Sequence, residues 1–432
     1  MLALKIKATP NNAEKFTKLN VVTSGVARTW NGSKWSETKS PTSNPASWLI
    51  EVLTSHTHKA SAIDFDTEID KDTFGELYEF CEDNGFKIDL VITEGDTKEN
   101  ILSKICSTCR CVLYRNIYGQ IAAAFDGIKE NSVALLNEQN LLSFSWEKKN
   151  ERQTDGIVCT FVNGDAGYVE DSYIVRPDGQ QGKRTGNETF ETAQIQAITH
   201  FPHIVKYARY LMATKKMRQR ACTAVIGNEG HYFTPFSKIS VQHPSLALGL
   251  GNSRIKSIIS DTTNTQIIGL ELYDPIEYNP NISNGYGVII DAPYIENGNE
   301  YTPIISRAYY AEGTSESENW RTTVIKFENP ILKTSKTIPH IDDTVSFGTL
   351  NNGDFNLIKN DFLITGIEPS GKNEFRLSLV DYNEEIYSSG VIPEYNPQIQ
   401  IPTLPFTELP TENTSDDFSK AVSVSKNYTN SE

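Results

Sequence analysis

Three cysteines close together are the first residues whose type and spacing could do chemistry. Cys106, Cys109 and Cys111 follow a C-x2-C-x-C pattern, and cysteine thiolates are common zinc ligands. A structural zinc needs four ligands in a tetrahedron, so Cys81 or one of the seven histidines would have to complete the set. Cys106 and Cys109, however, fall on the apolar stripe of an expected helix, where a thiol behaves as a small hydrophobic side chain. We therefore predict reduced core cysteines and no metal or other cofactor.

Two pairs of histidines could each supply two metal ligands. His56 and His58 have the spacing of a strand or loop, and His200 and His203 lie one helical turn apart. Neither pair has the glutamate of an H-E-x-x-H motif. We predict that these histidines are exposed or are satisfied by internal hydrogen bonds.

Two carboxylates, Asp64 and Asp66, are candidates for acid–base chemistry. A glycosidase pair needs carboxyl groups roughly 5 to 10 Å apart across a cleft, whereas acidic residues just before a helix are more often caps and turn formers. The sequence contains no G-x-S-x-G motif and no P-loop. It also contains no G-x-G-x-x-G before a helix, since Gly249-Leu250-Gly251 is expected in a turn between strands. We predict no catalytic residue, no cofactor-binding residue and no enzymatic activity.

Two amphipathic helices are expected to position the cysteines. Over 72–85 the apolar residues recur at i, i+3, i+4 and i+7, and Gly85 provides the stop. Over 97–109 the pattern returns, preceded by a capping box from Asp96 to Glu99. Both helices should pack on a sheet, for which strands are expected at 86–92, around a hairpin at 116–119 and at 156–162.

A third helix is expected to begin at Thr199 as its N-cap, with Pro202 tolerated in the first turn. It ends in a basic run formed by Lys215, Lys216, Arg218 and Arg220. The two lysines complement the negative end of the helix dipole. Because charge runs usually lie on the surface, we interpret the basic run as a solvated helix end.

The rest of the chain has the pattern of a β protein. Residues 1–43 contain strand-like runs and a hairpin turn at Trp30-Asn31-Gly32. After about residue 220, short apolar runs separated by Gly, Asn and Pro predict barrels or sandwiches. From about residue 392 the chain is rich in Pro, Thr and Ser and should be extended.

Composition narrows the class of protein further. At 432 residues, about two to four domains are expected, because single cores rarely exceed roughly 250 to 300 residues. A net charge of −15 argues against stable nucleic-acid binding. The sequence has no apolar signal-peptide core at its start and no run of roughly 20 apolar residues. We expect a soluble protein made in a cytoplasm.

The order of elements from Asn44 to Val175 resembles the central region of the host-specificity, or tip attachment, protein J family of long-tailed phages. In that family an Asn-Pro-Ala helix is followed by an Ile-Asp step, a second helix, and a helix that leads into a hairpin with Gly at its turn. This chain is similar at 44–48, Ile63-Asp64, Phe80-Cys81 and 114–119, and again at 206–212, 233–258 and 379–397. Ser237 and Lys238 replace the family's aspartate-valine pair.

The resemblance implies an α+β, β-dominated multidomain fold, with tail-hub domains of split-barrel-like sheets and packed helices plus an OB-like β-barrel. The expected parts are N-terminal strands at 1–43, a hub domain with three helices at 44–220, an OB-like barrel or insertion at 221–330, a second β-rich hub portion at 331–398, and a polar extended tail at 399–432. Family members usually have an earlier hub domain and a long receptor-binding region. A minimal hub, a hub split between genes and a truncated chain all fit.

By the same resemblance, the protein would be a structural virion protein at the tail tip or baseplate hub. It would close the distal tail tube as a three-fold ring and anchor host-attachment elements, after assembly in the host cytoplasm. The implied partners are further copies of the chain as a homotrimer, a tail tube or distal tail protein, the tape measure protein, tail fibre or receptor-binding proteins, and the host envelope. Two other classes stay open: a receptor- or carbohydrate-binding tail protein, and a tail-associated peptidoglycan hydrolase.

Overall fold

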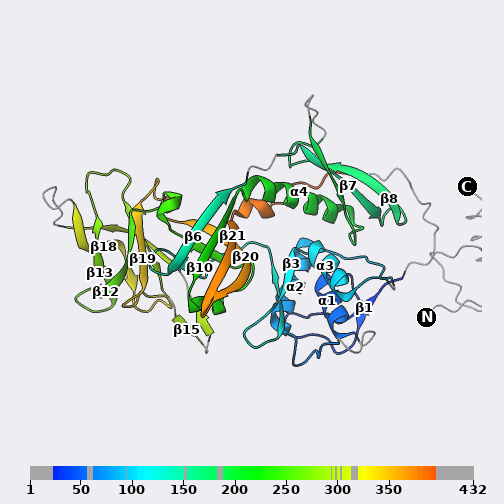
Figure 1. Cartoon of the computed structure of the whole chain (residues 1–432), viewed down its shortest axis with the longest axis horizontal. Helices are drawn as coiled ribbons and strands as arrows, with labels where there is room; N and C mark the ends of the chain where they lie inside the picture. Colours follow the sequence, from blue (N-terminus) through cyan, green and yellow to red (C-terminus); the bar gives the residue numbers. More distant parts are fainter. Residues whose placement is uncertain are drawn as a thin grey trace, which may run out of the picture. The chain divides into compact units, whose positions relative to one another are not determined.

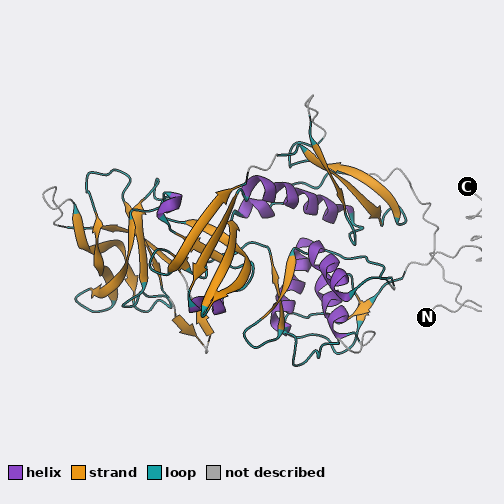
Figure 2. Cartoon of the chain, viewed as in Figure 1, coloured by secondary structure: helices purple, strands orange, loops and turns teal. Residues whose placement is uncertain are grey.

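A computed structural model of the chain describes residues 23–55, 62–93, 95–149, 153–181, 188–292, 294–296, 299–301, 304–312 and 320–395. Within the body Val26–Tyr395, strands predominate over helices (Figures 1 and 2), which confirms the α+β, β-dominated class. The expected strand near the N-terminus at 2–9 and the tail at 399–432 lie outside the described residues. None of the described helices has the length and apolar character needed to cross a membrane.

The first group of elements is helical. It contains α1 (Pro45–Thr54), α2 (Lys71–Asn84), α3 (Lys98–Thr108), and the hairpin of β3 (Cys111–Arg115) with β4 (Ile121–Phe125). The predicted stop at Gly85 is confirmed, because this residue adopts φ 65° and its N–H donates to the carbonyl groups of the last helical turn. The three helices bury apolar side chains in one core, including Leu49, Phe74, Leu77, Ile101 and Ile105.

A tryptophan hairpin covers this core. Trp30 and Trp35 form an antiparallel bridge across the predicted turn, and short strands β1 (Val26–Ala27) and β2 (Ser40–Pro41) pair beside it. The ring of Trp30 lies against α2 so closely that a Cβ atom at Gly75 would meet it at 2.7 Å. The Trp30 indole also donates to Glu79 at 2.9 Å.

Two local predictions in this region are wrong, the strand at 86–92 and the cap at Asp96. Residues 86–92 form no strand. The backbone N–H groups of this segment make single hydrogen bonds to carbonyl groups in different parts of the chain, as from Ile88 to Ser43, and these bonds form no ladder with one neighbouring strand. The N-cap of α3 is Thr97, whose side chain accepts from Asn100 N. Asp96 lies one residue too early to cap, and its carboxylate instead accepts from Thr93 N and pairs with Lys104 at 3.0 Å.

The second group is a three-stranded sheet with one helix. Strands β7 (Gly156–Asn163), β8 (Val169–Val175) and β9 (Phe190–Gln194) have the order β8-β7-β9, and α4 (Phe201–Met217) shares their core. The predicted strand at 156–162 is confirmed. The prediction of Thr199 as N-cap is wrong, because α4 is preceded by His200 without a side-chain cap bond. The Thr199 hydroxyl donates to the Asp89 carboxylate instead.

The third group is a six-stranded sheet of order β5-β11-β20-β21-β10-β6. Its strands are β5 (Leu135–Leu136), β6 (Leu141–Lys148), β10 (Arg220–Ile226), β11 (Lys238–Val241), β20 (Asn360–Gly371) and β21 (Glu374–Asp381). Neighbours pair antiparallel except β5 with β11. A short helix, η5 (Glu384–Tyr387), follows β21 and lies beside α4 (Figure 1).

The fourth group is a closed barrel inserted in sequence between β11 and β20. Its strands are β12 (Gly251–Ser260), β13 (Gln266–Glu277), β14 (Tyr286–Asp291), β17 (Ile304–Tyr310), β18 (Arg321–Leu332) and β19 (Thr344–Thr349), in the order β12-β13-β18-β17-β14-β19. A separate two-stranded sheet is formed by β15 (Tyr294–Glu296) and β16 (Asn299–Tyr301). The barrel has six strands, whereas an OB fold has five. The end of the barrel that the sequence placed at residue 330 lies inside β18. The strands expected after residue 220 are confirmed.

Candidate functional site

The cysteines lie in the core of the helical group. Cys109 is fully buried and its thiol lies 3.3 Å from the sulfur of Cys111, and Cys106 packs against the same core, which confirms the expected core position. All six cysteines are free. Burial raises the pKa of Cys81, so this thiol stays protonated and is a poor ligand. Over the described ranges, no three His, Cys, Asp or Glu residues are grouped so that they could hold a metal ion.

The histidines of α4 do not converge on one site. His203 is 1% exposed; its Nε2 lies 2.8 Å from Thr108 O and its Nδ1 lies 3.3 Å from Lys87 N. Burial lowers the pKa of His203 to about 4, so its ring is neutral at pH 7. His200 pairs separately with Asp89 at 3.4 Å. Internal satisfaction is confirmed for His203, while His56 and His58 lie outside the described residues.

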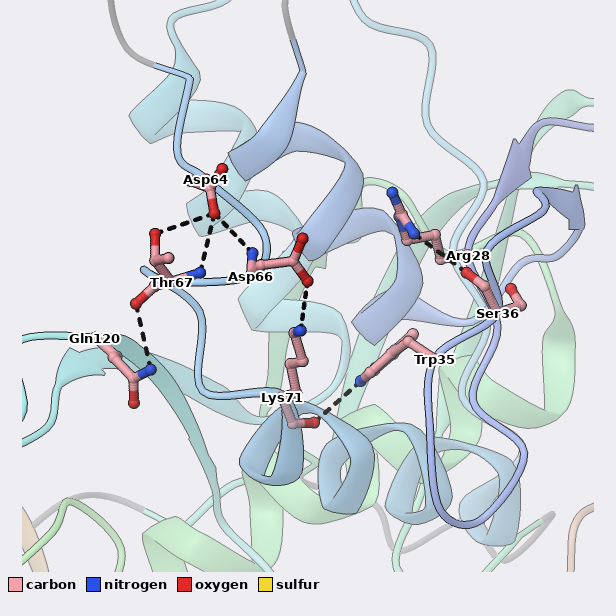
Figure 3. Close-up of polar contacts among 8 residues, drawn as sticks. All are labelled: Arg28, Trp35, Ser36, Asp64, Asp66, Thr67, Lys71 and Gln120. Atoms are coloured by element: carbon pink, nitrogen blue, oxygen red, sulfur yellow. Dashed lines mark hydrogen bonds and ion pairs between the residues drawn. The ribbon is translucent and has the colours of Figure 1, made fainter.

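Asp64 and Asp66 form a turn ahead of α2 (Figure 3). Asp64 Oδ1 accepts hydrogen bonds from Asp66 N and Thr67 N, each at 2.9 Å, and from the Thr67 hydroxyl at 3.0 Å. The bonds from Thr67 lower the pKa of Asp64, so this carboxyl group is ionised at neutral pH and is a weak base. Asp66 is exposed and pairs with Lys71 at 2.6 Å. The interpretation as turn formers is confirmed.

A buried carboxylate, Asp126, joins the helical group to two other parts of the body. Asp126 follows β4 and is 1% exposed. Arg218, directly after α4, donates to its two oxygens at 2.7 and 2.8 Å. Tyr387 of η5 donates to the same carboxylate at 2.6 Å, and so does Tyr210 of α4. We call these four residues the Asp126 junction.

The charges of the Asp126 junction match. Burial alone would raise the pKa of Asp126, but the two hydrogen bonds and the positive charge of Arg218 outweigh burial and lower it. Burial raises the pKa of Tyr210 and of Tyr387, so both phenols keep their protons and remain donors. Arg110 also stacks over the Tyr210 ring at 4.0 Å. The arrangement holds elements together, and the junction has no group poised to attack a substrate.

The interpretation of the basic run as a solvated helix end is wrong for the two arginines. The chain leaves α4 after Met217 and enters β10, which brings Arg218 to buried Asp126. Arg220, the first residue of β10, pairs with Asp381 of β21 at 2.7 Å. The predicted position of Lys215 and Lys216 in the last turn is confirmed, and Lys215 pairs with Glu191.

The sequence pattern did not indicate Asp126 or Tyr387. Asp126 and Arg218 are 92 residues apart, and Asp126 and Tyr387 are 261 residues apart. Asp126 precedes Gly127 at the end of a predicted strand, where an aspartate usually indicates a turn. Only the tertiary fold distinguishes it from the many exposed carboxylates of this acidic chain.

Replacing Asp126 with Asn should destabilise the protein strongly. The change leaves the Arg218 guanidinium buried without a counter-charge, which costs about 3–5 kcal/mol of unfolding free energy. Urea unfolding followed by tryptophan fluorescence measures this. The matched control, Glu51→Gln, breaks the more exposed Lys39–Glu51 pair and should cost less than about 1 kcal/mol. Asp126→Asn combined with Arg218→Gln should recover part of the loss; a single-variant cost no larger than that of Glu51→Gln would contradict the role of the junction.

His203 should make stability depend on pH. Its folded pKa of about 4 lies below the 6.5 of an ordinary histidine, so the unfolded chain takes up the proton first as pH falls. The stabilisation is complete above about pH 6.5 and is lost toward pH 4, with a slope contribution of about 1.4 kcal/mol per pH unit. Unfolding titrations should show a shallower slope for His203→Gln and an unchanged one for His231→Gln at an exposed histidine. Equal slopes of unfolding free energy against pH in all three proteins would contradict the assignment of this pH dependence to His203.

The buried thiols should react only after unfolding. Cys159 and Cys222 are buried, and burial raises the pKa of each to about 12, so neither offers a thiolate at neutral pH. A chromogenic disulfide reagent should therefore miss these two thiols and Cys81 in the folded protein, because all three are buried and protonated, and it should count all six thiols in denaturant. Elemental analysis of the same sample checks the metal prediction, which stoichiometric zinc would overturn.

Comparison with known proteins identifies no family. No family model matches the chain, and no curated protein matches it. Similar solved structures include a tail protein from Neisseria meningitidis MC58, with 11% identity and a TM-score of 0.27 over 40% of this chain and 57% of that one. The virion of a native gene transfer agent particle has 8% identity and a TM-score of 0.35 over 72% and 47%.

The 43 kDa tail protein of prophage MuSo2 from Shewanella oneidensis has 11% identity and a TM-score of 0.25 over 40% of this chain and 56% of that one. This chain thus spans about half the length of the solved chains it matches, at 57%, 47% and 56%. All three structures are of tails or virions.

Proposed function

We propose that this chain is a structural protein of a phage-type tail, acting as the central tail-tip or baseplate hub in a three-fold ring. The observation that carries the proposal is the Asp126 junction together with the order of elements around it. Asp126, directly after β4, meets Arg218, directly after α4, and Tyr387 of η5 at one desolvated ion pair, so the helical group is bonded to segments that continue into the six-stranded sheet. A subunit whose β-rich groups have fixed relative positions suits an assembly, because it fixes the positions of the subunits that bind to it.

Exposed sheet edges support assembly with further copies. β6 lies at one edge of the six-stranded sheet, where Leu142 is 60% and Trp146 41% exposed. β8 lies at an edge of the three-stranded sheet, where Val169 and Ile174 are 43% and 39% exposed. Edge strands with exposed apolar side chains favour pairing with another chain unless charge blocks them. We infer that these two edges contact neighbouring copies or the tail tube protein.

The finer features of this role follow from the same proposal. The ring would close the distal tail tube, contact the tape measure protein from inside and anchor tail fibre or receptor-binding proteins outside, at the tip of the virion. The part expected at 44–220 would be the hub domain, the closed barrel from β12 to β19 would be the insertion, and β20 with β21 would belong to the second hub portion. A peptidoglycan hydrolase is less well supported, because Asp64 and Asp66 are occupied in an exposed turn.

Lysine substitutions at the two edges should break the ring. We expect the purified chain to elute with three times its 48.3 kDa mass in light scattering. Leu142→Lys in β6 and Ile174→Lys in β8 should each shift the mass toward one chain, because a charged edge opposes strand pairing. The matched control is Val91→Lys, at a residue that is 84% exposed and belongs to no strand. A monomeric wild type, or rings that persist in both edge variants, would argue against this assembly.

A further inference from the structure

The barrel wall is incomplete between β17 and β18. These strands pair only at Tyr309 with Phe327 and at Tyr310 with Lys326. Toward the other end of β17, Ile304 to Ala308 still pair with β14 but have no partner on the β18 side. The two strands therefore diverge beyond Tyr309 and leave a seam in the wall.

A bulge in β18 keeps this seam open. On its other side β18 pairs with β13 at Ile267–Ile331 and next at Gly269–Lys326, so residues 327–330 stand opposite the single residue 268. Within this bulge Pro330 has no N–H to donate, and Glu328, Asn329 and Pro330 are all exposed. Bulges of this kind bend a strand and often re-aim side chains beside binding sites.

A cavity of about 560 Å³ lies at the seam. Its lining combines β17 residues Ser306 and Arg307, the bulge of β18, Asn284 before β14, and Phe355 after β19. The volume falls within the roughly 300 to 1,000 Å³ of small-ligand sites. Six lining residues carry amide, hydroxyl or charged groups and four are apolar, which suits a ligand that has both hydroxyl groups and an apolar face.

Arg307 and Glu328 give the cavity one charge of each sign, and the two residues form no ion pair with each other. Arg307 lies between Ile305 and Tyr309 on the same face of β17, the face whose apolar residues belong to the barrel core, and it stands opposite Val288 of β14. Its Nη1 donates to Ser306 O at 2.8 Å, but its Nε is buried and has no hydrogen-bond partner. No ion pair of Arg307 occurs in the part of the chain that the structure describes. An anionic oxygen in the cavity would satisfy this guanidinium, because arginine binds carboxylates through paired N–H groups.

We propose that the seam between β17 and β18 binds an acidic saccharide. The sugar carboxylate pairs with Arg307, and the hydroxyl groups bond to Asn284, Asn329 and Ser306. Glu328 accepts from further hydroxyl groups and, as a negative charge, disfavours polyanions such as nucleic acid. The Phe355 ring supplies an apolar surface for the face of the sugar ring. This binding site is separate from the proposed assembly role, so a negative result in the binding experiment would leave the assembly role unaffected.

The test is ligand binding by the full-length chain. We use saturation-transfer NMR with glucuronate, galacturonate and N-acetylneuraminate, and with glucose and galactose as neutral probes. At least one acidic sugar should bind, and the neutral sugars should bind at least roughly tenfold more weakly because they lack the charge-assisted bonds to Arg307. Arg307→Gln should weaken the acidic sugar by roughly tenfold or more. Arg321→Gln, which removes an exposed arginine at the other end of β18, is the matched control and should leave binding unchanged.

A second pair of variants keeps the test valid if Arg307→Gln disturbs the barrel. Asn329 is exposed on the bulge, so its substitution should not affect folding. Asn329→Asp should weaken binding of the acidic sugar through charge repulsion, and Asn329→Lys should strengthen it. Absence of binding by all three acidic sugars, equal binding of neutral sugars, or insensitivity to both Asn329 variants would overturn the proposal.

Discussion

The ion pair between Asp126 and Arg218 is the interaction on which the arrangement of this protein most depends. Its two charges are withdrawn from water, with side-chain exposures of 1% and 12%. A buried pair of this kind adds little net stability over an apolar contact, but losing one partner is costly. Tyr210 and Tyr387 complete the hydrogen bonding of the carboxylate. The junction therefore enforces a single geometry among the elements that meet there.

Such a constraint fits an assembly part better than an enzyme. Catalysis needs groups with free proton-transfer or nucleophilic capacity, whereas the polar groups of the Asp126 junction are engaged with each other. Asp64 is held in a turn, His203 is neutral between two backbone groups, and the Cys81 thiol stays protonated. What the described surface offers instead is sheet edges with exposed apolar side chains and one polar cavity in the barrel wall.

Local features of the fold were predictable because local chemistry determines them. Gly85 ends α2 since it adopts a left-handed conformation without strain, and the period of the apolar residues identified α2 and α3. The wrong predictions also have physical causes. The segment 86–92 has strand-like composition but no neighbour to pair with, and Thr97 displaces Asp96 as a cap because it stands one residue closer to the helix. The Asp126 junction and the barrel seam depend on residues far apart in sequence, for which one sequence contains no pairing signal.

We propose that copies of this chain form a three-fold ring. Electron microscopy of the purified full-length protein, with particle averages computed without imposed symmetry, tests this proposal. We expect closed rings with three-fold symmetry in which the β6 and β8 edges lie at contacts between copies. Single particles of one chain, or closed assemblies of another symmetry with both edges facing solvent, would contradict it.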